Sequence, residues 1–281
     1  MSTGSQIQSV VVVVSWWSNC LGLACLANLV EKTDGRAIYV VQVGKSAQQR
    51  ERFRAYMPVG IGELDYSETE PAEHSRVLQE VVVRHLPNKE GIWFIDHDTL
   101  FRVEVEPWLR LCDSWFSRSG TCLCLPRCKY NHSITQPAFW ISPGRWPKPI
   151  PSFDPVPFQA RESSRRPDLF RYQGEMIMPV KDTLTQARDE ILGTGHVITY
   201  SLQATSGNYS PLPPLPAYYH LGGLFLFAGP PLPAKYDSWM RETTRRFADF
   251  YSNCPTEWKN IEDPELLRRL EEFQGLFDVK G

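Results

Sequence analysis

Two aspartates separated by one residue form the clearest chemical signal in the sequence. Asp96 and Asp98 flank His97 and directly follow the apolar run 91–95. Because this run predicts a buried strand, we expect both carboxylates at its carboxyl end, within reach of a single cation. Mg²⁺ and Mn²⁺ prefer oxygen ligands and accept substrate phosphates as further ligands. The competing interpretation is a solvated turn, since aspartate is common directly after strands.

The elements around this motif alternate between strands and helices. Apolar runs predict strands at 10–14, 37–43, 62–64, 91–95, 121–125 and 138–141. Helical spacing of apolar residues predicts helices over 20–32, 47–57, 78–86, 107–119, 181–192 and 236–251, with a last one from Asp263 onward. Strands that alternate with helices over the first 100 residues predict right-handed crossovers and a doubly wound α/β sheet.

Proline divides the 281-residue chain into parts of different character. Seventeen of the 23 prolines fall between Pro126 and Pro233, which predicts a loop-rich second half. We therefore expect an α/β half at 1–125, a proline-rich half of the same domain at 126–233, and C-terminal helices at 234–281. A lid over a binding site could use the aromatic residues Trp140, Trp146, Phe153 and Phe158.

Composition excludes several classes of protein. Thirty basic residues against 32 acidic ones give a formal charge of −2, which does not favour nucleic-acid binding. Seven cysteines, an odd number in a long chain, suggest reduced thiols and a cytoplasmic protein. The uncharged run 10–30 is long enough for a membrane span. We expect none, because no basic residue precedes it and polar or small residues interrupt it at Ser15, Ser18, Asn19, Gly22 and Asn28.

The strand, the Asp-x-Asp motif and its place in an α/β chain resemble the GT-A glycosyltransferases, in particular family 2-like members. A second segment, Lys181-Asp182-Thr183-Leu184 followed by Arg188 and Gly195, looks like the family's "ED-x-x-L … R … G" pattern, with lysine in place of the usual glutamate. A third, 219–223, is similar to the late His-x-x-Gly segment that supplies a metal ligand in some GT-A enzymes. The likeness covers roughly residues 9–228.

The resemblance implies a GT-A-type Rossmann-like mixed sheet flanked by helices, in which the half at 1–125 binds the nucleotide sugar and the proline-rich half at 126–233 binds the acceptor. It implies transfer of a sugar from a nucleotide-diphosphate sugar, a UDP-sugar being favoured, to an acceptor hydroxyl on a glycan, peptide or small molecule. Mn²⁺ or Mg²⁺ would be held by Asp96, Asp98 and His220. Asp182 is the candidate base, with its pKa lowered by Lys181, and Glu175, expected in a loop, is the alternative base. A helix cap is the competing role for Asp182, and a structural role the one for His220.

Further residues are expected around the donor nucleotide. Ser15 and Asn19 could hydrogen-bond its base or ribose, and Trp16 or Trp17 could stack on the base. Asp65 could accept a base N–H, and Arg76 could reach a phosphate from a helix start. His97 is grouped with them as substrate-binding. The alternatives are core packing for the tryptophans, a turn for Asp65 and a solvated surface for Arg76.

Two other functions remain open at this stage. Phe94-Ile95-Asp96-His97-Asp98-Thr99 superficially resembles the D-x-D-x-T motif of haloacid dehalogenase-like phosphatases, but the threonine comes one position too early. In addition, that motif normally opens the catalytic sheet, whereas three predicted strands precede it here. The other alternative is a non-catalytic protein of the same fold that binds a nucleotide sugar or acts as a scaffold, an idea that the lysine at position 181 keeps open.

Overall fold

The structure is a computed structural model of the full chain. It describes residues 8–16, 18–66, 74–126, 138–146, 153, 171–172, 175–176, 197–200, 212–221, 237–264, 266–268 and 271–272. The statements below concern these residues alone.

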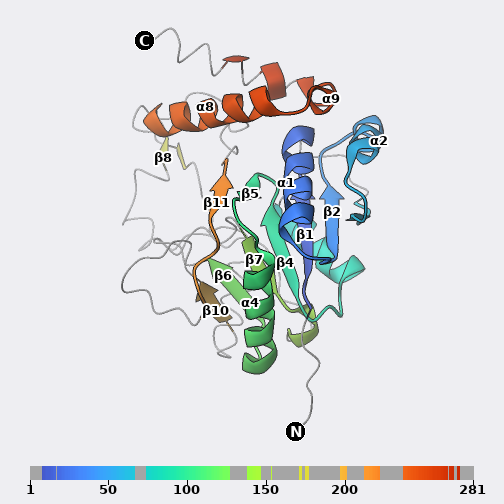
Figure 1. The fold of residues 1–281 in the computed structure, drawn as a ribbon, viewed down its shortest axis with the longest axis vertical. Helices are drawn as coiled ribbons and strands as arrows, with labels where there is room; N and C mark the ends of the chain where they lie inside the picture. The colour runs from blue at the N-terminus through green and yellow to red at the C-terminus, as the bar shows by residue number, and fades with distance from the viewer. Residues whose placement is uncertain are drawn as a thin grey trace.

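A seven-stranded sheet forms the centre of the molecule (Figure 1). Its strands lie in the order β10-β6-β7-β4-β1-β2-β3. β7 is antiparallel to both of its neighbours, and every other neighbouring pair is parallel. The strands are β1 Val10–Ser15, β2 Ile38–Gln42, β3 Gly62–Glu63, β4 Ile92–Asp96, β6 Leu123–Pro126, β7 Ala138–Ile141 and β10 Val197–Tyr200. The predicted α/β class with a mixed sheet is confirmed.

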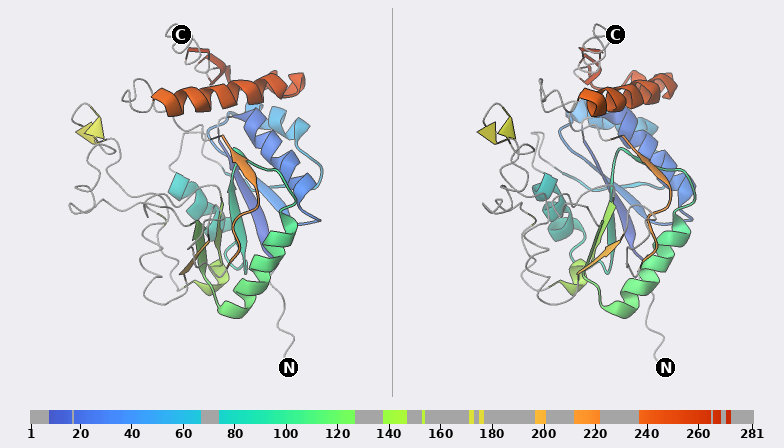
Figure 2. Two further views of the ribbon diagram at one scale, coloured as in Figure 1. Left: turned by 60° about the vertical axis from the view of Figure 1, so that its left-hand side comes forward. Right: turned by 90° about the vertical axis from the view of Figure 1, so that its left-hand side faces the viewer.

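Helices cover both faces of this sheet (Figure 2). α1 (Asn19–Lys32) and α4 (Glu106–Ser119) pack on one face. α3 (His74–Glu80), continued by a π-helical turn at Val81–His85, packs on the other. Successive side chains of β1 point to opposite faces of the sheet, as the strand pleat requires. Val11 and Val13 face the α1 side, and Val10, Val12 and Val14 face the α3 side. Burial on both faces explains why five consecutive valines form this strand.

The uncharged run 10–30 divides into two elements rather than one. β1 ends at Ser15, and α1 begins at Asn19 after Ser18, whose hydroxyl accepts a hydrogen bond from the Leu21 N–H as an N-cap. Within the residues that the structure describes, there is no helix both long enough and apolar enough to cross a bilayer.

Local signals also explain the other predicted helices. Ser46 and Gln49 form a capping box at the start of α2 (Ala47–Tyr56), so the helix begins where its sequence predicts. Gly120 ends α4 with a φ of 67°, a left-handed conformation that favours glycine.

Two short strand pairings were not predicted. β5 (Thr99–Phe101) follows the Asp-x-Asp motif and pairs antiparallel with β11 (Tyr218–His220). β8 (Arg171–Tyr172) pairs with β9 (Glu175–Met176). Glu175 therefore lies in a short strand and not in the predicted loop, because it pairs with Tyr172 of β8.

The C-terminal helices lie across the edge of the sheet where the parallel strands end. α8 (Asp237–Asn253) crosses above β11 and above the start of α1 (Figures 1 and 2). α9 (Thr256–Lys259) follows it and contacts α1. We call this edge, at the ends of β1, β2, β3 and β4, the carboxyl edge, and the opposite one the amino edge.

Three aromatic residues expected in an acceptor lid are instead part of the core. Trp140 stacks on Phe116 with ring centroids 4.1 Å apart, and Trp146 packs edge-on against Phe153 at 5.2 Å. All of them are buried, so their faces contact the protein itself. The expectation was wrong for these three because Trp140 lies on β7 beneath α4, and Trp146 and Phe153 pack into the core cluster on the α3 side. Phe158 lies outside the described residues.

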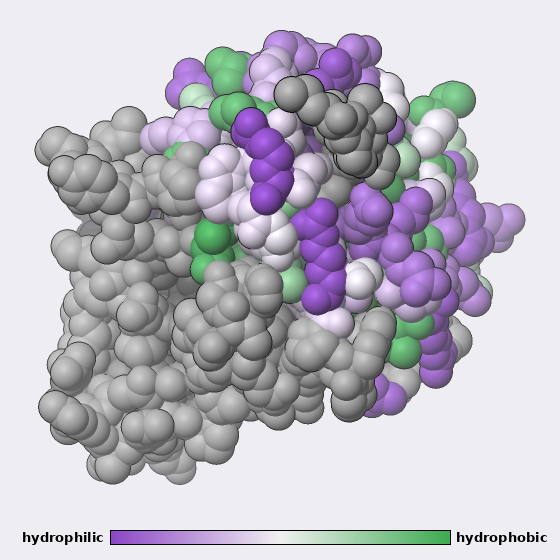
Figure 3. All heavy atoms as spheres, turned by 90° about the horizontal axis from the view of Figure 1, so that it is seen from below, coloured by the Kyte–Doolittle hydropathy of each residue, from purple (hydrophilic) through white to green (hydrophobic). Residues whose placement is uncertain are grey.

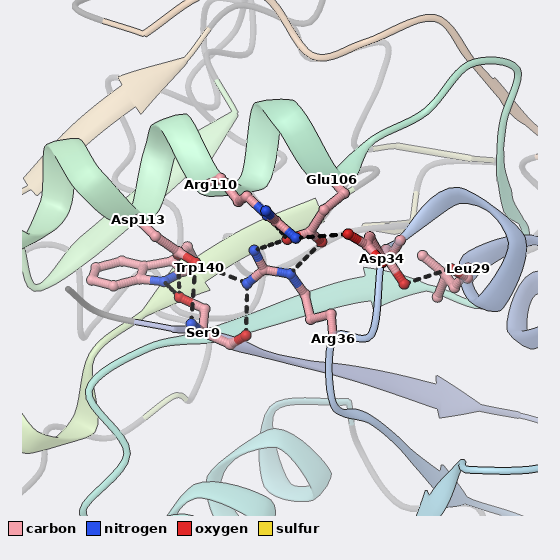
Figure 4. A network of polar contacts seen from close by, with 9 residues as sticks. Ser9, Leu29, Asp34, Arg36, Glu106, Arg110, Asp113 and Trp140 are labelled. Carbon is pink, nitrogen blue, oxygen red and sulfur yellow. Dashed lines mark hydrogen bonds and ion pairs between the residues drawn. The ribbon is translucent and has the colours of Figure 1, made fainter.

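A buried ionic network closes the amino edge (Figure 4). The Arg36 guanidinium donates two hydrogen bonds to Glu106, at 2.8 and 2.9 Å, and one to Asp113 at 2.8 Å. It also donates to the Ser9 carbonyl at 2.7 Å, while the Ser9 hydroxyl donates to Asp113 and accepts from Trp140 Nε1. These contacts tie the segment before β1 to α4 and β7.

Candidate functional site

The Asp-x-Asp motif lies where the strand order of the sheet changes direction. From β1 the chain continues to β2 and β3 on one side, whereas β4 pairs on the other side of β1. Asp96 is the last residue of β4 and lies opposite Val14 of β1. Ligands of open α/β sheets bind outside the carboxyl ends of the strands at such a switch point. The topology therefore makes this place a candidate binding site independently of any motif.

The two aspartates differ in exposure. Asp98 is buried, and Asp96 is half-buried. His97, between them, is buried as well. The chain turns at 97–98 and returns as β5, which α1 holds through two hydrogen bonds between the Asn28 amide group and the backbone of Phe101. The motif is thus fixed on both sides by regular structure, which limits its motion.

The third predicted metal ligand comes to the same place through strand pairing. In the β5–β11 ladder, His220 lies opposite Thr99. The N–H of Leu221, the next residue, donates to the Asp98 carbonyl at 3.1 Å. The side chain of His220 is not among those described. Its backbone lies beside the second aspartate, although the two residues are more than 100 positions apart in the chain.

The predicted nucleotide contacts divide between the two faces of the sheet. Trp16 is half-buried and packs with the cluster on the α3 side, the side of Val14. Ser15 is fully buried toward α1, where Gly22 leaves room for its hydroxyl, because a Cβ at that position would come within 2.3 Å of Ser15 Oγ. Trp17 lies outside the described residues.

Ser15 has a partner that the sequence analysis missed. Lys45, fully buried after the end of β2, donates from Nζ to Ser15 Oγ at 2.8 Å and lies 4.1 Å from the centroid of the Phe53 ring. Burial lowers the pKa of Lys45 to about 7, against the charges of Glu262 and Glu63, which raise it. Lys45 comes two residues after the predicted strand 37–43. Its place near a strand end was a usable signal, since Ser15 and Asp96 were chosen because they follow predicted strands.

Asn19 is bound by the C-terminal segment. The buried Glu262 carboxylate accepts hydrogen bonds from the backbone N–H groups of Asn19 and Cys20, at 2.8 and 3.0 Å, and from the Ser18 hydroxyl at 2.8 Å. The Asn19 amide group also donates to the Ile261 carbonyl at 2.5 Å. Glu262 thus satisfies the free donors at the start of α1, a place that favours an anion.

The remaining predicted residues lie at the rim or outside the described part. Asp65 follows β3 and is exposed, and its carbonyl accepts a hydrogen bond from the His85 ring. Arg76 is exposed on α3. Asp182 lies outside the described residues, and of Glu175 only the backbone is described, so the assignment of the base remains a prediction.

The donor set suits a hard divalent cation. Asp96 and Asp98 offer carboxylate oxygens from one strand end, and Mg²⁺ is commonly held by one or two carboxylates together with substrate phosphates. Among the side chains that the structure describes, no three His, Cys, Asp or Glu residues form a complete metal cluster. His220 remains the predicted third protein ligand.

Comparisons with known proteins give likeness in structure only. No family model matches the chain, and no curated protein matches it. A structure titled as the galactosyltransferase LgtC in complex with donor and acceptor sugar analogs has 14% identity over 89% of this chain and 99% of that one, with a TM-score of 0.47.

Two further similar structures are also named as transferases. A putative nucleotide-diphospho-sugar transferase from Desulfovibrio desulfuricans G20 has 7% identity over 73% of this chain and 92% of that one, with a TM-score of 0.37. The bifunctional glycosyltransferase WbbM has 9% identity over 52% of this chain, with a TM-score of 0.36. The match spans only 33% of the WbbM chain. At these scores and identities, the function has to be argued from the site itself.

Proposed function

We propose that this protein is a metal-dependent glycosyltransferase that moves a sugar from a nucleotide-diphosphate sugar to an acceptor hydroxyl. The observation that carries the proposal is the position of Asp96 and Asp98 at the switch point of the sheet, with the strand that bears His220 paired to β5. A chain with two carboxylates at this place can bind a diphosphate through a shared cation.

The proposed cation would be Mn²⁺ or Mg²⁺, held by Asp96, Asp98 and His220. When bound, it would offset the negative charge that develops on the leaving diphosphate. The fixed turn at 97–98 keeps the two carboxylates in place before the donor arrives, so little ordering is needed on binding. Trp16, half-buried beside this edge, is proposed to pack against the nucleobase.

The acceptor hydroxyl must lose its proton during transfer. If the configuration of the sugar is inverted, Asp182 or Glu175 would take that proton from a position within hydrogen-bond reach. If it is retained, neither has to act as a base. The acceptor is proposed to be a glycan, a peptide or a small molecule.

The first test is a thermal-shift panel with UDP, GDP, CDP and TDP, each with and without Mn²⁺. Wild type is compared with Asp98→Asn and with the matched control Asp34→Asn, whose carboxylate is exposed at the far side of α1. At ligand concentrations near 100 Kd, binding stabilises the native state by about 2.7 kcal/mol, which raises Tm by roughly 5 °C.

We expect a manganese-dependent shift with one nucleotide, UDP being favoured, in wild type and in the control but not in Asp98→Asn. A shift that needs no metal, or that survives in Asp98→Asn, would contradict the metal site. Release of the nucleoside diphosphate from its sugar, followed by mass spectrometry of candidate acceptors, then separates a transferase from a protein that only binds. Hydrolysis of phosphate monoesters without any nucleotide shift would favour the phosphatase.

A further inference from the structure

Two cysteines from opposite ends of the chain meet beside the carboxyl edge. Cys20 lies in the first turn of α1, and Cys254 directly follows α8. Both belong to a small buried cluster, separate from the two clusters that cover the sheet. Its members are Cys20, Leu21, Leu221, Phe247, Tyr251, Cys254 and Leu266.

One carboxylate oxygen holds the two cysteine-bearing segments together. Glu262 Oε2 accepts from the Cys20 N–H at 3.0 Å and from the Tyr251 hydroxyl at 2.5 Å. The Cys254 N–H in turn donates to the Tyr251 carbonyl at 3.2 Å. The segments are therefore fixed relative to each other, and the Cys20 S–H donates a hydrogen bond to the Cys254 sulfur.

The two thiols are chemically unequal. The hydrogen bond from Cys20, helped by the positive charge of Lys259, lowers the pKa of the Cys254 thiol against the effect of burial. The same hydrogen bond, together with burial, raises the pKa of Cys20. Cys254 is the more accessible of the two, with 8% of its surface exposed against none for Cys20. Cys254 is thus suited to react first and Cys20 to act as its partner.

We propose that Cys20 and Cys254 form a disulfide when the protein meets a peroxide, which ties the C-terminal helices to α1 beside the candidate donor site. The Cys254 thiolate takes one oxygen from hydrogen peroxide, and water is released after protonation. The Cys20 sulfur then attacks the sulfenic acid, so that the S–S bond forms, the S–O bond breaks and a second water leaves. The two thiols together lose two electrons, which reduce the peroxide O–O bond.

The remaining described cysteines offer no comparable pair. Cys25, Cys112 and Cys124 lie in the core cluster on the α1 side of the sheet. Burial raises the pKa of Cys112 and of Cys124, which keeps these thiols unreactive. Cys122 donates from its S–H to backbone carbonyls and serves as the control position.

The test treats folded wild type, Cys254→Ser and Cys122→Ser with a small excess of hydrogen peroxide. The peroxide is then removed, and the proteins are unfolded in urea, alkylated and digested without reduction. In wild type we expect a cross-linked Cys20–Cys254 peptide, five alkylated cysteines in place of seven, and a higher Tm that dithiothreitol reverses. Cys122→Ser should retain the cross-link, and Cys254→Ser should lose it.

Three results would overturn the proposal. In the first, wild type keeps both cysteines alkylatable after peroxide treatment. In the second, Cys254 couples to a different cysteine. In the third, the cross-link forms as readily in urea-unfolded protein, which would remove any role for the folded geometry. The inference does not depend on the proposed glycosyltransferase activity.

Discussion

Each edge of the central sheet buries a cationic side chain, and the two cations differ in the partners that surround them. At the amino edge, the Arg36 side chain is 1% exposed and contacts the carboxylates of Glu106 and Asp113 at 2.8 Å. At the carboxyl edge, Lys45 is fully buried and donates to the Ser15 hydroxyl. Within the described part of the chain, no carboxylate forms an ion pair with Lys45.

Titration reflects this contrast. Burial alone would lower the pKa of either cation. For Arg36, the hydrogen bonds to Glu106 and the nearby Asp113 more than offset burial, so that its pKa is raised. For Lys45, burial dominates and the pKa falls to about 7. A cation with complete partners supports the structure, whereas an incompletely neutralised one is typical of the neighbourhood of a functional site.

The surfaces beyond the two edges also differ. Seen from the amino edge, the described part of the surface is mostly hydrophilic or intermediate, with hydrophobic residues in small separate groups (Figure 3). At the carboxyl edge, α8 and α9 cover the start of α1, and Glu262 accepts the hydrogen bonds of the donor groups there. The chain closes one edge with side chains from the sheet and α4, and the other with a late segment.

Removal of Arg36 should have the largest effect on stability. Arg36→Met leaves the carboxylates of Glu106 and Asp113 buried without their cation, so the free energy of unfolding should fall by about 3–5 kcal/mol. Urea unfolding at pH 7 measures this change. Arg110→Met is the control, because Arg110 also bonds Glu106 but its side chain is 58% exposed, and it should cost less than about 1 kcal/mol. Equal losses in the two variants would show that the network is not the stabilising feature.

Glu262→Gln should have an intermediate effect. The variant keeps the shape but loses the charge that accepts bonds from Ser18 and from the backbone at the start of α1, so we expect a loss of about 2 kcal/mol. The exposed Glu257→Gln in the same segment should stay within about 0.5 kcal/mol of wild type. Urea unfolding again provides the measurement. If Glu262→Gln leaves the free energy of unfolding unchanged, the hydrogen bonds from Glu262 to the start of α1 contribute nothing to stability.

Lys45→Met should show the smallest effect, one that depends on pH. The folded pKa of Lys45, about 7, lies below its usual value of 10.5, so the unfolded chain binds more protons between these values and stability rises with pH across that window. Relative to Lys45→Met, wild type should therefore gain about 1.4 kcal/mol between pH 6 and pH 8.

Unfolding free energies at pH 6, 7 and 8 test this expectation. Lys89→Met removes an exposed lysine, and its pH profile should follow that of wild type. A constant difference between wild type and Lys45→Met at all three pH values would show that Lys45 keeps its charge when buried. The two edges would then hold their cations in the same way.

Much of the fold could be predicted because its signals are local. Five consecutive valines require a strand buried on both faces, and Ser46 with Gln49 requires a helix start. β5 and β11 could not be predicted, because three-residue strands carry no usable periodicity. Trp140, Trp146 and Phe153 were misassigned, because an aromatic side chain among prolines looks the same in sequence whether its face is buried or exposed.

In the candidate site, too, local features were predictable and long-range contacts were not. The position of the Asp-x-Asp motif at the end of a strand was predicted correctly, because a strand end is a local feature of the sequence. The nearness of His220 to Asp98 was expected only through a family resemblance, and the structure supports it through one ladder. Ser15 and Asn19 were chosen for a ligand, and the structure shows that Lys45, Glu262 and Ile261 already bond them.

The sequence by itself determined most strands and helices of the first half, the α/β class, and the pair of aspartates at a strand end. Tertiary structure decided the reversed strand β7, the pairing of β11 with β5, and the closure of α1 by Glu262. The physical reason is that burial patterns and caps depend on neighbours within a few residues. A buried donor, acceptor or charge needs a partner, and that partner can come from any part of the chain that packs beside it. The Asn19 N–H, for example, donates to Glu262, which lies 243 positions away in the chain.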